Sequence, residues 1–194
     1  MLALVGTIVM TRRGGGAMPA AAGAGAPVAA PAAGAAGVLP ASSDALPDLS
    51  TMTPVEQFDR LFDRVMRASE GGDAASVATF APMAMAAFAS LPAPDIDARF
   101  HAGLIQLSSG DVTGATAHAA AIAKEQPAHL FGILLRGRIA ERGQDAAGVA
   151  AARAAFLAAY PAEIAAERPE YPGHQAMIDR FLKDATPPAV QPGA

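Results

Sequence analysis

The sequence has no cysteine and no tryptophan, and only 5% of its 194 residues are aromatic. The absence of cysteine excludes a disulfide framework, a thiolate nucleophile and a cysteine-based zinc site. Alanine dominates the 52% apolar fraction, which predicts helices that pack closely and bury little area each. The net charge of −4 lacks the basic surplus typical of nucleic-acid-binding proteins, so we expect no nucleic-acid partner.

The motifs of catalytic and metal-binding sites are also missing. The histidines His101, His118, His129 and His174 form no pair four residues apart and no H-E-x-x-H motif. Residues 108–111 (SSGD) lie at an expected helical turn, and residues 14–16 (GGG) lack the Lys-Ser/Thr of a phosphate loop. We therefore predict no enzyme, no cofactor, no metal and no small-molecule substrate. The distant alternative is a small-molecule or metal site that involves His101 or His129.

Residues 1–13 combine an apolar run, Met1–Met10, with Arg12 and Arg13. The run is shorter than the roughly 20 residues that span a bilayer, and its basic residues follow it, whereas those of a secretory signal come first. We favour the end of a membrane-spanning helix whose start lies upstream. The alternatives are an atypical secretion signal and a disordered start with no targeting role. An anchor of this charge pattern predicts a domain facing the cytoplasm, and a signal predicts export to the periplasm or cell surface.

Composition separates a linker and a tail from one folded domain. Residues 14–50 are rich in Ala, Gly and Pro, nearly uncharged and without a sustained apolar period, so we interpret them as a disordered linker. Residues 186–194 are a short disordered tail. The chain has far more Arg than Lys, which together with its Ala, Gly and Pro content is typical of GC-rich bacterial coding sequences. The remaining residues, 51–185, are the expected domain.

Residues 51–185 carry the start and stop signals of successive helices. Thr53-Pro54-Val55-Glu56 is a capping box with proline at the first helical position, followed by apolar residues at helical spacing. Asp73 and Asp95 are expected N-caps, and Pro82 predicts a break because proline lacks a backbone N–H. The expected helices are 54–70, 74–80, 82–90, 96–109, 112–125, 128–142, 146–160 and a closing helix 173–184, with a short turn at 164–168.

Residues 96–161 read as one helical hairpin written twice with a period of 34. Four residues recur without a gap: Gly103 as Gly137, Asp111 as Asp145, Gly114 as Gly148 and Pro127 as Pro161. Glycine inside a helix costs about 1 kcal/mol relative to alanine, so its repetition predicts close helix packing. The aspartates are expected to cap the second helices, and the prolines to follow their ends.

These positions resemble the tetratricopeptide repeat, whose pattern is W-x2-L-G-x2-Y, then A-x3-F, then P. Gly103, Ala115 and Pro127 match the Gly, Ala and Pro positions of the first copy. The Trp, Leu, Tyr and Phe positions are unmatched in both copies, and Val149 replaces the second Ala, so the repeats are degenerate. The resemblance implies an all-α, right-handed stack of about three antiparallel hairpins with a C-terminal capping helix. The alternative is a non-repeat helical bundle.

In that family the first helices of the hairpins line a concave groove that holds a peptide or a partner helix. The resemblance implies a groove of nine residues: Asp59, Phe62, Met66, Phe100, Leu104, Phe131, Leu134, Arg138 and Glu141. The alternative role for these residues is packing in the core. Phe100 and Leu104 replace the Lys and Asn of the family's carboxylate clamp, so an amphipathic helix or extended peptide is the expected ligand.

We therefore expect a non-catalytic protein-interaction module or scaffold, tethered to a bacterial membrane, with a protein partner that the sequence does not identify. The alternative is a structural subunit docked permanently in an envelope or cytochrome-biogenesis-type assembly, as similar repeats are. Both functions require helical hairpins that stack on one another.

Overall fold

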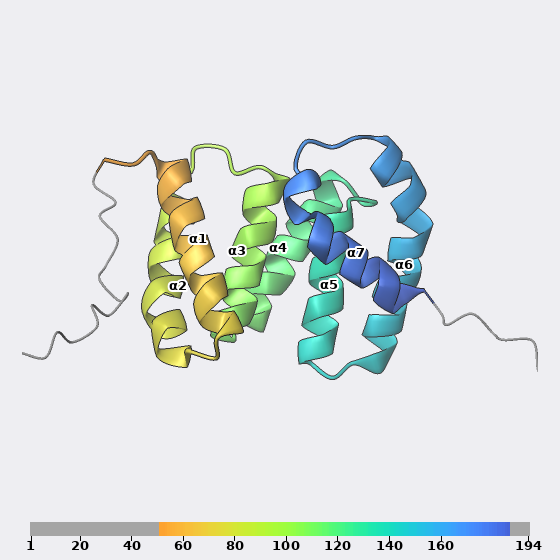
Figure 1. Cartoon of the computed structure of the whole chain (residues 1–194), viewed down its shortest axis with the longest axis horizontal. Helices are drawn as coiled ribbons and strands as arrows, with labels where there is room; N and C mark the ends of the chain where they lie inside the picture. The colour runs from red at the N-terminus through yellow and green to blue at the C-terminus, as the bar shows by residue number, and fades with distance from the viewer. Residues whose placement is uncertain (1–50, 187–194) are drawn as a thin grey trace, which may run out of the picture. The chain divides into compact units, whose positions relative to one another are not determined.

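The computed structural model of the chain describes residues 51–186, which hold seven α-helices, one 3-10 turn and no strand. Figure 1 shows them in chain order: α1 (Pro54–Glu70), α2 (Ala74–Ala89), α3 (Ile96–Ser109), α4 (Val112–Glu125), α5 (Leu130–Arg142), α6 (Ala146–Ala165), the 3-10 turn η1 (Pro172–His174) and α7 (Gln175–Ala185). The predictions for residues 1–13, 14–50 and 187–194 lie outside the described residues. Between residues 51 and 186, no helix has the length and apolar content needed to cross a membrane.

Capping side chains directly before the first helical residue fix where most of the helices begin. The hydroxyl of Thr53 accepts the N–H of Glu56, whose carboxylate accepts the N–H of Thr53 in return, which confirms the capping box. The four expected aspartate caps also each accept a backbone N–H three residues ahead: Asp73, Asp95, Asp111 and Asp145. Each cap satisfies an N–H that has no partner inside the helix. The expected starts of α1, α2, α3, α4 and α6 are therefore confirmed.

Two prolines do not end helices as the sequence predicted. α2 runs without a break through Pro82, so the predicted division at 82 is wrong. α6 runs through Pro161 to Ala165, so the helix does not end at residue 160 and the turn predicted at 164–168 begins two residues later. Both helices bury side chains beyond the proline: Ala84 is fully buried in α2, and Glu163 is 7% exposed in α6. That packing offsets the backbone hydrogen bond that each proline removes.

Successive helices pack against one another in chain order. The antiparallel pairs α1–α2, α3–α4 and α5–α6 are hairpins, and each hairpin contacts the next element through α2–α3, α4–α5 and α6–α7. The first helices also touch, α1 with α3 and α3 with α5, while α7 lies across α5 and beside α6 (Figure 1). The described residues are therefore all-α, with consecutive helices packed together around two groups of buried apolar side chains.

The repeated glycines lie where helices approach most closely. A Cβ atom on Gly103 of α3 would overlap the Leu135 side chain of α5. A Cβ atom on Gly137 of α5 would lie 2.8 Å from Cε2 of Phe181 in α7. Both distances are shorter than real Cβ atoms make, so alanine at either position would force the facing Leu135 or Phe181 side chain to shift. α7 therefore approaches α5 at Gly137, and α5 approaches α3 at Gly103, the glycine 34 residues earlier.

Candidate functional site

The nine residues predicted to line the groove divide into buried and accessible groups. Phe100, Leu104, Phe131 and Leu134 are core residues with 0–8% exposure, so the expectation that they line an open groove does not describe this chain. Phe62, Met66 and Arg138 are half-buried, while Asp59 and Glu141 are exposed. The physical reason for the difference is the chain segment after α6, which crosses the inner face of α5.

Two aromatic rings form the centre of that covered face. Phe100 and Phe131 stack with ring centroids 4.5 Å apart and an interplanar angle of 17°. His174 of η1 meets both rings edge-on, at 5.7 Å from Phe100 and 4.8 Å from Phe131. Tyr171 meets Phe131 at 5.3 Å from the other end of the same turn. The turn before α7 therefore closes over the stacked pair and removes it from solvent.

A buried polar network fixes this turn over the start of α5. The Tyr171 hydroxyl donates to Glu163 at 2.6 Å and accepts the N–H of Leu130 at 3.1 Å, and Arg168 forms two hydrogen bonds to the same carboxylate. His129, with no exposed surface, accepts the N–H of Phe131 through Nδ1 and binds Glu170 through Nε2. Burial lowers the pKa of His129, which keeps the neutral form needed for this cap. The buried side chains of His129, Glu163 and Tyr171 thus each have hydrogen-bond partners within this network.

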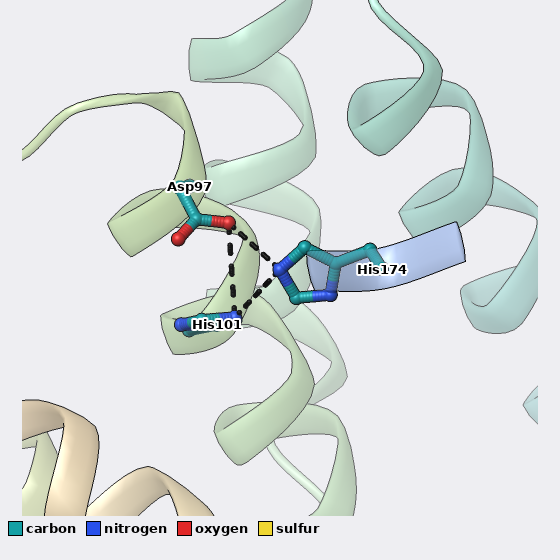
Figure 2. A group of neighbouring side chains, drawn as sticks. All are labelled: Asp97, His101 and His174. Atoms are coloured by element: carbon teal, nitrogen blue, oxygen red, sulfur yellow. Dashed lines mark hydrogen bonds and ion pairs between the residues drawn. The ribbon is translucent and has the colours of Figure 1, made fainter. Parts of the chain in front are cut away.

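Beside this network, three side chains converge from two separate parts of the chain (Figure 2). Asp97 and His101 lie one turn apart on the same face of α3, and His174 reaches them from η1. The Nε2 atom of His174 is 2.9 Å from Oδ1 of Asp97 and 3.2 Å from Nε2 of His101. The Nε2 atom of His101 is 3.7 Å from the same carboxylate oxygen. These three atoms form the Asp97–His101–His174 cluster.

The hydrogen atoms available in this cluster do not satisfy all its contacts. A carboxylate has only acceptor atoms, and a neutral imidazole carries one N–H on its two nitrogens. If His174 donates from Nε2 to Asp97, that nitrogen has no second hydrogen for a linear bond to Nε2 of His101. If His101 donates to His174 instead, the lone pair of His174 faces the carboxylate. The two imidazoles carry one hydrogen each, and neither arrangement satisfies all three contacts at once.

Burial and charge act on the cluster in opposite directions. Burial lowers the pKa of His101 to about 4, and the nearby Asp97 carboxylate only partly opposes this shift. Burial alone would raise the pKa of Asp97, but the hydrogen bond from His174 and the charge of His101 outweigh it, so the pKa lies below its ordinary value. On α1, burial and then the charge of Asp97 raise the pKa of Asp59. The cluster thus lies in negatively charged surroundings.

Local sequence motifs do not reveal this cluster, because its residues come from distant parts of the chain. Asp97 lies in the first turn of α3, and His174 is 73 residues from His101. The pair Asp97 and His101 does have i, i+4 spacing, which was the one local signal available. His129, named as a candidate, forms a separate polar network with Glu170, and His118 of α4 packs edge-on against Phe88 instead.

The described residues also contain an open groove on the side of the second helices. α4 and α6 both pack on α5 but have no close backbone contact with each other. The space between them measures about 580 Å³. Most of its lining side chains are alanine, with a few larger residues: Thr116, Arg136, Ile139 and Asp145. This groove was not predicted, because its position depends on how far apart two non-adjacent helices lie.

Comparison of the chain with protein-family models, with curated proteins and with solved structures gives no match.

Proposed function

We propose that residues 51–186 are a tetratricopeptide-like helical-repeat domain that binds a protein partner without catalysing a reaction. The repeated packing supports this proposal: the glycine pair and the aspartate caps recur 34 residues apart in equivalent contacts. Stacked hairpins bury only their neighbouring faces, so they leave long surfaces available to partners. A right-handed stack and a domain tethered to a membrane through residues 1–13 remain part of the proposal.

The α4–α6 groove is the observation that carries the proposed function, and we place the partner there. Its lining is apolar and its side chains are small, so a partner's backbone can approach closely. Its volume, about 580 Å³, suits one row of side chains from an amphipathic helix or extended peptide. Arg136 and Asp145 add one charge of each sign to the lining, which suits a partner with polar flanks. The first-helix face competes as a location only through its accessible residues, such as Asp59 and Glu141.

Matched variants separate the two surfaces. Ala120→Glu with Ala151→Glu places two charges in the groove at exposed helical positions. Ala117→Glu with Ala158→Glu makes the same change at exposed positions of the same helices outside the groove. Asp59→Lys with Glu141→Lys reverses exposed charges on the first-helix face. All these positions are exposed, so each variant should keep its helical circular dichroism spectrum.

The full chain and the three double variants are immobilised and exposed to bacterial lysate, and bound proteins are quantified by mass spectrometry. We expect one protein to be retained by the wild type and by the Ala117/Ala158 variant, but at least ten-fold less by the Ala120/Ala151 variant. Loss only in the Asp59/Glu141 variant would move the interface to the first-helix face. Capture that none of the variants alters, or no capture at all, would refute binding through the proposed surfaces.

A further inference from the structure

The Asp97–His101–His174 cluster has the dimensions of a metal site. Its three separations are 2.9, 3.2 and 3.7 Å. Ligand atoms bound about 2.1 Å from one zinc ion are roughly 3.0 Å apart at right angles and roughly 3.4 Å apart at tetrahedral angles. An ion just outside the plane of these three atoms is therefore within bonding distance of all of them. A cation in place of the imidazole hydrogens would satisfy all three electron-rich atoms at once.

We propose that Asp97 Oδ1, His101 Nε2 and His174 Nε2 together bind one divalent transition-metal ion, with Zn²⁺ as the first candidate. Two imidazoles and one carboxylate suit Zn²⁺ and its first-row neighbours, whereas Mg²⁺ and Ca²⁺ prefer oxygen ligands. Three protein ligands leave at least one coordination position for water. Asp97, whose side chain is 35% exposed, borders the path by which an ion enters.

The surrounding rings hold the two imidazoles in place before an ion binds. Phe62 of α1 stacks on His101, with centroids 3.8 Å apart and an interplanar angle of 15°. His174 is held edge-on by Phe100 and Phe131. These contacts restrict rotation of both rings, so little conformational entropy is lost when a metal binds. The ligands are therefore preorganised by three aromatic side chains from three helices.

A bound ion would connect α3 with the turn before α7. Asp97 and His174 are 77 residues apart in the chain. They meet only in the folded state, so the free energy of metal binding adds to the free energy of unfolding. The ion would also hold η1 over the stacked Phe100 and Phe131. Metal binding should thus protect the C-terminal segment more than the first hairpin.

The test uses the full chain without an affinity tag, stripped of metal by a chelator and titrated with ZnCl₂ in a calorimeter. We expect one Zn²⁺ per chain. Asp97→Asn replaces the charged carboxylate ligand with a neutral amide of nearly the same shape, and His174→Gln replaces the imidazole ligand with a smaller polar side chain. Each should weaken binding more than about 100-fold, since even supporting residues contribute 10–100-fold. His118→Gln, which alters a half-buried histidine outside the cluster, should bind as the wild type does. Circular dichroism establishes that each variant is folded.

Limited trypsin digestion gives a second measurement that does not depend on calorimetric heat. Zn²⁺ should slow cleavage after the exposed Arg180 and Lys183 of α7 in the wild type and in His118→Gln, but not in His174→Gln. Wild-type protein that binds no Zn²⁺, Co²⁺ or Ni²⁺ below 1 mM would overturn the proposal. Unchanged binding in folded Asp97→Asn and His174→Gln would also overturn it, because the ion would then lie elsewhere. If one of these variants unfolds, the other provides the test.

Discussion

Replacing Phe131 with alanine tests whether the inner face of α5 is core or open surface. The side chain has no exposed area, and its ring contacts four aromatic rings, those of Phe100, His129, Tyr171 and His174. A buried Phe→Ala substitution costs about 3–5 kcal/mol, and each aromatic pair contributes about 0.5–1.5 kcal/mol beyond the buried area. Four aromatic neighbours place the expected loss in free energy of unfolding in the upper part of that range, at about 4–5 kcal/mol.

The measurement is a urea titration of the full chain followed by far-ultraviolet circular dichroism. Leu157→Ala is the matched control, because Leu157 is a large apolar residue of α6 that is 37% exposed, and it should lose less than about 1.5 kcal/mol. An unchanged slope of unfolding free energy with urea shows that both variants unfold as the wild type does. A loss below about 1 kcal/mol for Phe131→Ala would refute the reasoning, because the ring would then not be enclosed by η1 and α7.

Three further predictions concern packing, capping and pH. Gly137→Ala should lower the free energy of unfolding by about 1–2 kcal/mol, because the cost of overlap with Phe181 exceeds the gain in helix propensity. Gly173→Ala is the control, because a Cβ atom there meets open space, and it should be neutral or slightly stabilising. Thermal unfolding measures both variants. Asp145→Ala should cost about 1 kcal/mol in the same assay through loss of the α6 cap, and an unchanged melting temperature would contradict the capping role. Lowering the pH from 7 to 5 in the presence of a chelator should lower the free energy of unfolding by about 2 kcal/mol through His101. In the unfolded chain this histidine takes up a proton near pH 6.5, whereas burial lowers its pKa in the folded chain to about 4. Its contribution to stability is therefore full above pH 6.5 and declines below it. Urea titrations at pH 7, 6 and 5 measure this change, and His101→Gln should make the free energy of unfolding depend less steeply on pH.

The helix positions could be predicted because their signals are local. Asp111 and Asp145 cap their helices through N–H groups three residues away, a distance at which no other part of the chain needs to be known. The two prolines show the limit of such signals. Pro82 and Pro161 each remove one backbone hydrogen bond, and burial of side chains that follow them offsets the loss, so the helix continues.

The groove prediction shows a second limit of sequence patterns. Apolar residues at helical spacing give the same pattern whether they face the interior or an open groove. Phe131 satisfies both descriptions, and the turn before α7 makes it core because Tyr171 and His174 lie against its ring. The position of that turn depends on the Tyr171 hydroxyl, which donates to Glu163 and accepts the N–H of Leu130 in α5, contacts that periodicity does not report.

Local sequence signals were sufficient to predict the helical class of residues 51–186, most of their helix starts and the 34-residue spacing of the close-packed glycines, because capping and periodicity act within a few residues or repeat at a fixed interval. The tertiary structure alone decided which inner residues are covered, where the α4–α6 groove opens, and that His174 meets Asp97 and His101. The physical reason is that each depends on residues far apart in the chain. The covered residues and the cluster depend on the closing segment folding across α5 and α3, and the groove depends on the distance between α4 and α6.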